Sequence, residues 1–272
     1  IGLMSGTSMD GVDASIIKSD GLAKYDNVLD EYWEFDVILR EKLVDLRSKI
    51  ITKDNLVDFS EQLKILEREI TIFHGKVVNE ILSKFKGNVD IIGFHGQTIF
   101  HNSDNKISKQ LGNGRLLSQL TKKNVVFDFR KNDLENGGQG APLTPIYHNL
   151  LANSISKEYE NSFSNILNIG GISNLTQTVK ESDESKINIE AFDIGPGNCL
   201  IDDWVRKNSS KKYDKDGLIG KSGKIDQLIL NQAIENFRVT TYDKSLDIKD
   251  FDISFARGLS LEDGCATITD FT

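Results

Sequence analysis

A short apolar strand, a glycine-rich loop and a return strand follow one another twice in this 272-residue chain. The first copy covers residues 1–18 around the loop at 5–11, and the second covers residues 164–179 around the loop at 170–174. The copies share an architecture and not their residues. Two such hairpins predict an α/β protein with two halves, in which the two loops clasp a polyphosphate between two domains.

The first loop is rich in groups that suit an anion. Hydroxyl groups stand at Ser5, Thr7 and Ser8, and a carboxylate stands at Asp10. Backbone N–H groups of such a loop can approach a phosphate, and the carboxylate suits a hydrated Mg²⁺ ion. The classical P-loop is excluded because no Gly-Lys-Ser/Thr and helix follow. An ordinary polar hairpin is the alternative, but six small or polar residues in seven favour phosphate binding.

The stretch at 191–198 places a carboxylate between a strand and a helix. Alternation predicts a strand over 186–192, and helical spacing predicts a helix over 199–205 that Asn198 caps. A strand end beside a helix N-terminus is where α/β proteins place catalytic groups and bind anions. Asp193 is therefore a candidate catalytic residue. The alternative is that Asp193 only braces the turn.

Two further strand ends carry candidate ligand-binding groups. A buried strand over 89–94 leads into His95 and Gln97, which could read a hydroxyl or amide group. A histidine that is hydrogen-bonded within its own loop is an equal alternative. A central strand over 124–129 delivers Arg130, whose guanidinium suits a carboxylate or phosphate. The alternative for Arg130 is a solvent-facing pair with an aspartate.

The spacing elsewhere predicts ordinary core elements. Residues 32–39 alternate like a strand, and apolar residues at helical spacing fill 40–82. Helices are also predicted over 222–237 and 261–271, the first with a buried face made by Ile225, Leu228, Ile229, Ala233 and Ile234. The glycine-rich segment 136–143 is either a linker or a hinge with ligand contacts. We place the domain boundary there, giving domains 1–140 and 141–272.

Composition and charge exclude several classes of protein. The chain is 38% hydrophobic and 27% charged, and no apolar run is long enough for a membrane span or an export signal. A net charge of −8 disfavours a nucleic-acid or anionic-membrane binder. The two cysteines, Cys199 and Cys265, form no ligand cluster and fit a reducing compartment. We expect a cytoplasmic protein that binds neither nucleic acid nor membrane.

Six motifs resemble those of the anhydro-N-acetylmuramic acid kinases, a family in the actin, hexokinase and heat-shock-chaperone ATPase superfamily. They occur in the family's order across essentially the whole chain. The matching stretches are residues 1–13, 95–98, 128–130, 137–143, 168–174 and 192–198. One stretch alone would be a weak signal, and six in order are a strong one.

The resemblance implies an actin/hexokinase-like α/β fold with ribonuclease H-like halves and an active site in an interdomain cleft. It implies a reaction in which ATP, water and 1,6-anhydro-N-acetylmuramic acid give N-acetylmuramic acid 6-phosphate and ADP with the help of Mg²⁺. Asp193 would be the catalytic base, and a homodimer is allowed. The candidate nucleotide-binding residues are Gly6, Thr7, Ser8, Met9, Asp10, Gly11, Val12, Asp13, Gly170, Gly171, Ser173 and Asn174. The candidate sugar-binding residues are His95, Gln97, Arg130, Gly195 and Asn198, and no metal ligand is assigned.

One departure from the family concerns length. Typical members extend further at the C-terminal end, so the second half is expected to be incomplete and truncated there. Two rival functions follow. The chain could be another sugar kinase of the same superfamily, with a hydroxyl in place of water as the nucleophile, or an inactive remnant that binds nucleotide without turnover.

Overall fold

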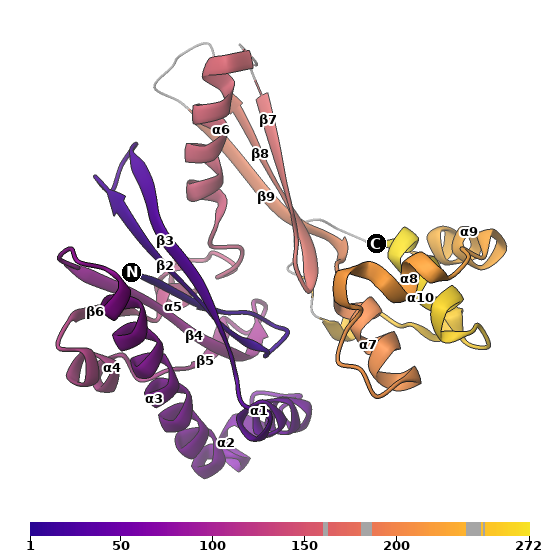
Figure 1. The fold of residues 1–272 in the computed structure, drawn as a ribbon, viewed down its shortest axis with the longest axis horizontal. Helices are drawn as coiled ribbons and strands as arrows, with labels where there is room; N and C mark the ends of the chain where they lie inside the picture. The colour runs from indigo at the N-terminus through magenta and orange to yellow at the C-terminus, as the bar shows by residue number, and fades with distance from the viewer. Residues whose placement is uncertain (160–162, 181–186, 238–245, 247) are drawn as a thin grey trace. The chain divides into compact units, whose positions relative to one another are not determined.

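The computed structural model describes residues 1–159, 163–180, 187–237, 246 and 248–272. The chain is a mixed α/β protein that divides into two compact units, Ile1–Ala141 and Pro142–Thr272 (Figure 1). Each unit contains its own sheet. No helix among the described residues has the length and apolar character needed to cross a membrane.

The sheet of the first unit is mixed, with the strand order β3-β2-β1-β4-β5 and with β6 paired to β4. Strand β1 pairs antiparallel with β2 and parallel with β4, which confirms the predicted opening hairpin. Its strands are β1 (Gly2–Ser5), β2 (Gly11–Ser19), β3 (Tyr25–Glu34), β4 (Ile91–Asn102), β5 (Ile107–Leu111) and β6 (Asn124–Phe127).

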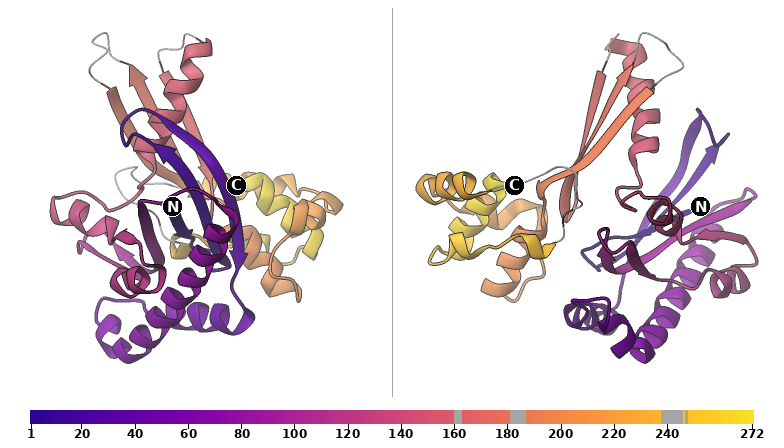
Figure 2. Two further views of the ribbon diagram at one scale, coloured as in Figure 1. Left: turned by 60° about the vertical axis from the view of Figure 1, so that its left-hand side comes forward. Right: turned by 180° about the vertical axis from the view of Figure 1, so that it is seen from behind.

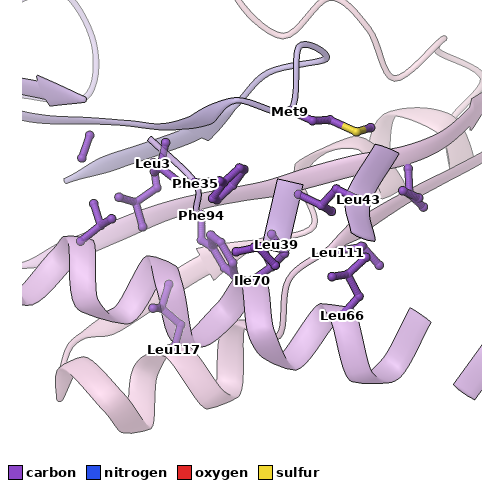
Figure 3. Packing of buried hydrophobic residues seen from close by; sticks show 14 of the residues in the cluster. Leu3, Met9, Phe35, Leu39, Leu43, Leu66, Ile70, Phe94, Leu111 and Leu117 are labelled. Carbon is purple, nitrogen blue, oxygen red and sulfur yellow. The ribbon is translucent and has the colours of Figure 1, made fainter. Parts of the chain in front are cut away.

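Helices cover one face of this sheet (Figure 2). They are α1 (Val37–Lys49), α2 (Asn55–Asp58), α3 (Ser60–Lys84) and α4 (Gly114–Thr121), whereas α5 (Phe129–Glu135) lies at the other face, where Phe129 approaches Gly93. Leu3 and Phe94 from the sheet pack against Ile70 of α3 and Leu117 of α4, all of them almost completely buried (Figure 3). Each such side chain contributes about 1.5–3 kcal/mol on burial. The predicted helical stripe of residues 40–82 is therefore confirmed as core.

The strand predicted over 32–39 is wrong at its C-terminal half. Strand β3 ends at Glu34, and α1 begins at Val37. The carboxylate of Asp36 accepts a hydrogen bond from the backbone N–H of Leu39 at 2.8 Å. This N-cap turns an apparently alternating run into the first turn of a helix.

The strand predicted to end at residue 94 continues, because β4 runs on to Asn102. His95 and Gln97 consequently lie inside a strand and not after one. Gly96 between them has φ 71°, and a Cβ atom there would lie 2.4 Å from the carbonyl oxygen of Leu111. The register with β1 shifts at this point, since Leu3 pairs with Phe94 but Ser5 pairs with Gln97. Strand β4 thus contains a bulge that requires glycine.

The predicted central strand over 124–129 is an edge strand in the described part of the chain. Strand β6 ends at Phe127 and pairs only with β4 there. Asp128 adopts φ 62°, and α5 begins at Phe129. Asp128 changes the direction of the backbone between β6 and α5. Arg130 therefore lies in the first turn of a helix and not at the end of a strand.

The sheet of the second unit is an antiparallel meander in the order β7-β8-β9. Its strands are β7 (Phe163–Ile169), β8 (Ile172–Lys180) and β9 (Ile187–Pro196), and α6 (Pro145–Tyr159) contacts all three. His148 of α6 is hydrogen-bonded through Nδ1 to the Thr176 hydroxyl at 2.6 Å. The predicted second hairpin is confirmed, but its loop is shorter than expected. Ser173 and Asn174 lie in β8, and only Gly170 and Gly171 form the turn.

The rest of the second unit is helical. Its elements are α7 (Cys199–Asn208), α8 (Leu218–Ser222), α9 (Gln227–Asn236), α10 (Leu261–Phe271) and the short 3₁₀ turns η1 (Lys215–Gly217), η2 (Ile248–Asp250) and η3 (Ser254–Ala256). Trp204 and Val205 of α7 pack with Cys265 and Ile268 of α10. The predicted helices over 199–205 and 261–271 are confirmed.

The helix predicted over 222–237 is confirmed over Gln227–Asn236, but its start is wrong. Helix α8 ends at Ser222, and Asp226 caps a separate α9 by accepting hydrogen bonds from the N–H groups of Leu228 and Ile229. The buried residues of α9 are Leu230 and Ala233, so only Ala233 of the predicted stripe is confirmed as buried. The expected core residues Ile225, Leu228 and Ile234 are 40%, 79% and 52% exposed.

Candidate functional site

The loop between β1 and β2 is held by a buried amide from β4. Gln97, which is completely buried, donates through Nε2 to the carbonyl oxygens of Gly6 at 2.9 Å and Thr98 at 3.3 Å. Its Oε1 lies 2.5 Å from the hydroxyl of Ser5, which donates to it. Within the loop, the N–H of Met9 donates to the same Gly6 carbonyl at 3.2 Å, and Met9 adopts φ 54°.

Two carboxylates lie near the end of this loop, Asp10 within it and Asp13 in the following strand β2. Asp10 accepts a hydrogen bond from the Ser8 hydroxyl at 2.7 Å. Partial desolvation, and then the nearby charge of Asp10, raise the pKa of Asp13 above its usual value. The described residues contain no cluster of three or more His, Cys, Asp or Glu side chains that could hold a metal ion. Carboxylates of this kind fit Mg²⁺, which commonly takes one or two of them together with phosphate oxygens and water.

His95 and Arg130 form a pair on the other side of the Gly96 bulge. Nδ1 of His95 donates to the Gly96 carbonyl at 2.7 Å, which leaves Nε2 as an acceptor. Nε2 accepts from Nε and Nη2 of Arg130 at 3.1 and 2.9 Å. Burial, and then the charge of Arg130, lower the pKa of His95 to about 4. The imidazole is therefore neutral at physiological pH.

The same arginine fixes the glycine loop that follows α5. Nη1 of Arg130 donates to the Gly140 carbonyl at 2.6 Å, and Oδ2 of Asp133 accepts from the Gly140 N–H at 2.7 Å. Gly140 adopts φ 70° and has no room for a Cβ atom, because Leu134 would lie 2.9 Å away. Arg130 is thus not in the solvent-facing aspartate pair considered above. Arg130 and Asp133 instead bind the two polar groups of one peptide residue.

In the second unit, the β7–β8 turn is clamped to the start of α7. The N–H groups of Gly197 and Cys199 donate to the Gly171 carbonyl at 3.1 and 3.3 Å, and that of Asn198 donates to the Gly170 carbonyl at 2.8 Å. These donors of the helix start are therefore already used. Asn198 occupies the N-cap position as predicted, but its side chain makes no capping hydrogen bond.

Asp193 lies within β9 and not after it, because the strand continues to Pro196. Its Oδ2 accepts a hydrogen bond from the backbone N–H of Leu246 at 2.8 Å, and its neighbour across the ladder is Asn174. Burial raises the pKa of Asp193, and the Leu246 hydrogen bond partly offsets this effect. The carboxylate is held by one donor in a partly desolvated place, which suits a group that accepts protons.

The structure brings the predicted residues together in separate groups. The first unit joins Gly6 to Gln97 and, separately, His95 to Arg130. The second unit joins the glycine turn to the 195–198 stretch, where Gly195 pairs with Ser173. Sequence reasoning missed the Gly140 carbonyl and the Leu246 N–H as partners. Both are backbone groups distant in sequence from the side chains they hold, so no local pattern could indicate them.

Comparisons with known proteins give a consistent result. The family model described as anhydro-N-acetylmuramic acid kinase matches residues 1–257. The anhydro-N-acetylmuramic acid kinase of Pelagibacter ubique is 53% identical over the whole of this chain, which spans 72% of that relative. The proteins of the same name from Agrobacterium fabrum and Zymomonas mobilis are 36% and 38% identical over the whole chain, which spans 72% and 74% of them.

Proposed function

Because the chain belongs to the anhydro-N-acetylmuramic acid kinase family, we propose that it is a kinase that opens 1,6-anhydro-N-acetylmuramic acid and phosphorylates it. The products are N-acetylmuramic acid 6-phosphate and ADP, a step of peptidoglycan recycling and amino-sugar metabolism. The family match over nearly the whole chain carries this proposal. The mixed α/β architecture with a glycine loop in each sheet is compatible with an actin/hexokinase-like ATPase that works in an interdomain cleft.

Asp193 is the catalytic base in this proposal. It takes a proton from water as the water oxygen attacks C1 of the sugar. The bond between C1 and O6 breaks, and O6 accepts the γ-phosphoryl group while ADP leaves. A raised pKa strengthens Asp193 as a base, and the Leu246 N–H keeps the carboxylate in one orientation.

The glycine loops bind the nucleotide in this proposal. The segment Gly6 to Asp13 binds the phosphates through backbone N–H groups of its loop, and Gly170 and Gly171 do so from the turn of the second unit. Ser173 and Asn174 lie in the middle strand β8 and would contribute their side chains. Asp10 and Asp13 would hold Mg²⁺, which offsets the charge of the phosphates. The Oδ1 atom of Asn174 is buried and has no hydrogen-bond partner among the described residues. As an acceptor it suits a hydroxyl group of the nucleotide or a water molecule, and not a phosphate oxygen.

Arg130 binds the sugar in this proposal. A guanidinium has five N–H donors, and three of them point at His95 and Gly140. The remaining two suit the lactyl carboxylate of the sugar. Gly195 and Asn198 follow Asp193 closely in sequence and would contact the same ligand. His95 then acts by holding Arg130. An ATP-consuming reaction of this kind belongs in the cytoplasm.

The proposal is tested by offering two sugars to the purified chain with Mg-ATP. We expect ADP release and a sugar 6-phosphate, identified by mass spectrometry, with 1,6-anhydro-N-acetylmuramic acid and not with reducing N-acetylmuramic acid. Turnover of the reducing sugar alone would instead indicate another sugar kinase of the superfamily. Binding of Mg-ATP by calorimetry without turnover of either sugar would indicate an inactive nucleotide-binding protein.

A further inference from the structure

We propose that Gln97 is a positioning residue for the nucleotide: it holds the carbonyl of Gly6 inward, so that the loop between β1 and β2 presents N–H groups to the phosphates. This inference rests on the proposed nucleotide site in that loop. Gln97 then orders the loop and does not contact the sugar. Three observations support this role: the hydrogen bonds of the Gln97 amide, the position of the Gly6 carbonyl and the bulge in β4.

Both donors of the Gln97 amide are already used. Its two N–H bonds point at the carbonyl oxygens of Gly6 and Thr98, and its oxygen accepts from Ser5. The opposite amide orientation would place Oε1 against two carbonyl oxygens, so the hydrogen-bond partners fix which atom is nitrogen. With complete burial of the side chain, these contacts leave no room for contact with a substrate.

The orientation of the Gly6 carbonyl decides whether this loop can bind an anion. It accepts from both Nε2 of Gln97 and the N–H of Met9. The N–H groups of Thr7 and Ser8, next in the loop, have no hydrogen-bond partner among the described residues. A carbonyl dipole turned toward a phosphate would repel it, whereas unpaired N–H groups attract it. Fixing the Gly6 carbonyl therefore preorganises the loop for an anion.

The bulge at Gly96 explains why β4 supplies this amide. The extra residue in β4 brings Gln97 opposite Ser5, whereas Phe94 lies opposite Leu3. In a regular strand of the same sequence, Gln97 would stand three residues after Phe94 and would face the other side of the sheet. The Ser5 hydroxyl lies 2.5 Å from Oε1 of Gln97 and 2.9 Å from the carbonyl of Gly11, and its one proton can be donated to either acceptor. The start of the loop is thus held by Gln97 through Ser5 and through the Gly6 carbonyl.

The test uses two substitutions of Gln97 and a control on the neighbouring strand. Gln97→Met removes the amide at nearly constant volume. Gln97→Glu keeps the shape and can donate to Gly6 only when its carboxyl group is protonated. The control is Gln110→Met, because the hydrogen bonds of the Gln110 amide within the described part of the chain go to the Thr98 and Ser108 hydroxyls and not to the loop. Mg-ATP dissociation constants by calorimetry, KM for each substrate and thermal unfolding are measured for all four proteins.

We expect Gln97→Met to weaken Mg-ATP binding about tenfold, with a smaller change in KM for the sugar, whereas Gln110→Met binds like the wild type. Gln97→Glu should bind nearly normally in acid and lose affinity as the pH rises, because ionisation sets a carboxylate against the Gly6 carbonyl. The wild type should lack this pH dependence. This readout is reversible within one folded protein, so it remains decisive if Gln97→Met is unstable.

Two results would overturn the inference. One is an unchanged Mg-ATP dissociation constant in Gln97→Met together with a Gln97→Glu variant whose binding does not vary with pH beyond the wild type. The other is a loss confined to the sugar KM, which would make Gln97 a sugar-binding residue. If the wild type binds Mg-ATP in a Gln97-dependent way but phosphorylates neither sugar, the proposed function fails and this inference stands.

Discussion

The guanidinium of Arg130 donates to a single nitrogen of His95, with Nε and Nη2 at 3.1 and 2.9 Å from Nε2. This geometry requires a neutral imidazole protonated on Nδ1, which the hydrogen bond to the Gly96 carbonyl provides. A histidine that accepts from an arginine cannot also be a general acid in this state. In the proposed function, His95 therefore affects sugar binding through the orientation of Arg130.

A matched pair of substitutions distinguishes the role of Nε2 of His95 from that of Nδ1. His95→Gln places an acceptor near the position of Nε2 and should retain much of the wild-type KM for the sugar. His95→Asn reaches only the position of Nδ1, leaves Arg130 without its acceptor, and should raise that KM about tenfold. Steady-state kinetics at saturating Mg-ATP checks this. Equal effects of both substitutions would show that Nε2 does not position Arg130.

The pH dependence of turnover is expected to report the Asp193 carboxyl group. The base must be ionised, so kcat should fall as the pH is lowered through the pKa of Asp193. Burial raises that pKa above the usual value of about 4. Asp193→Asn should reduce phosphoryl transfer by at least about a hundredfold with Mg-ATP binding retained. Asp203→Asn, at an exposed partner of Lys207, is the control that should leave both unchanged. Near-normal turnover by Asp193→Asn would remove Asp193 as the base.

Local sequence patterns were sufficient for much of this fold. The stripe through Leu43 and Ile70, and the helix 261–271, depend on periodicity and caps that lie within a few residues. The failures were also local in origin. The Asp36 cap started a helix inside a run that alternation had indicated as a strand, and the Asp226 cap started α9 later than the predicted helix.

The site was harder to predict because its contacts are not local. Gln97 and Gly6 lie 91 residues apart, and their contact depends on one bulge that alternation cannot reveal. Asp193 and Leu246 lie 53 residues apart and meet through a backbone N–H that any residue would supply. The types of residue were informative about the chemistry, whereas the partners of each residue required the tertiary structure.

Acid is expected to destabilise the first unit through His74. This side chain is completely buried, its Nδ1 donates to the Ile70 carbonyl at 2.8 Å, and its Nε2 has no hydrogen-bond partner among the described residues. Burial lowers the pKa of His74 from 6.5 to about 4. Because the folded state resists protonation, stability is complete above about pH 6.5 and falls as the pH drops toward about 4. The full loss is about 3 kcal/mol.

Urea unfolding at about pH 7.5 and about pH 4.5 measures this effect. His74→Asn can keep the hydrogen bond to Ile70 without a group that titrates in this range, so its loss of stability between the two pH values should be smaller than that of the wild type. The comparison uses the difference between pH values, which cancels the cost of the smaller side chain. An equal loss in both proteins would assign the acid sensitivity to other groups, such as His95.

The last prediction concerns the hydrogen bonds between the β7–β8 turn and the start of α7. Two of the glycines there, Gly170 and Gly197, differ in the space around them. A Cβ atom on Gly197 would lie 2.0 Å from the carbonyl oxygen of Gly170, whereas a Cβ atom on Gly170 would meet nothing closer than 3.7 Å. Gly197→Ala must therefore separate the turn from the helix start and break the hydrogen bonds of Asn198 and Cys199. We expect it to cost about 2–3 kcal/mol of stability and to weaken Mg-ATP binding. Gly170→Ala should change the unfolding temperature little. If thermal unfolding shows the two variants to be equally stable, the close backbone contact does not hold this turn.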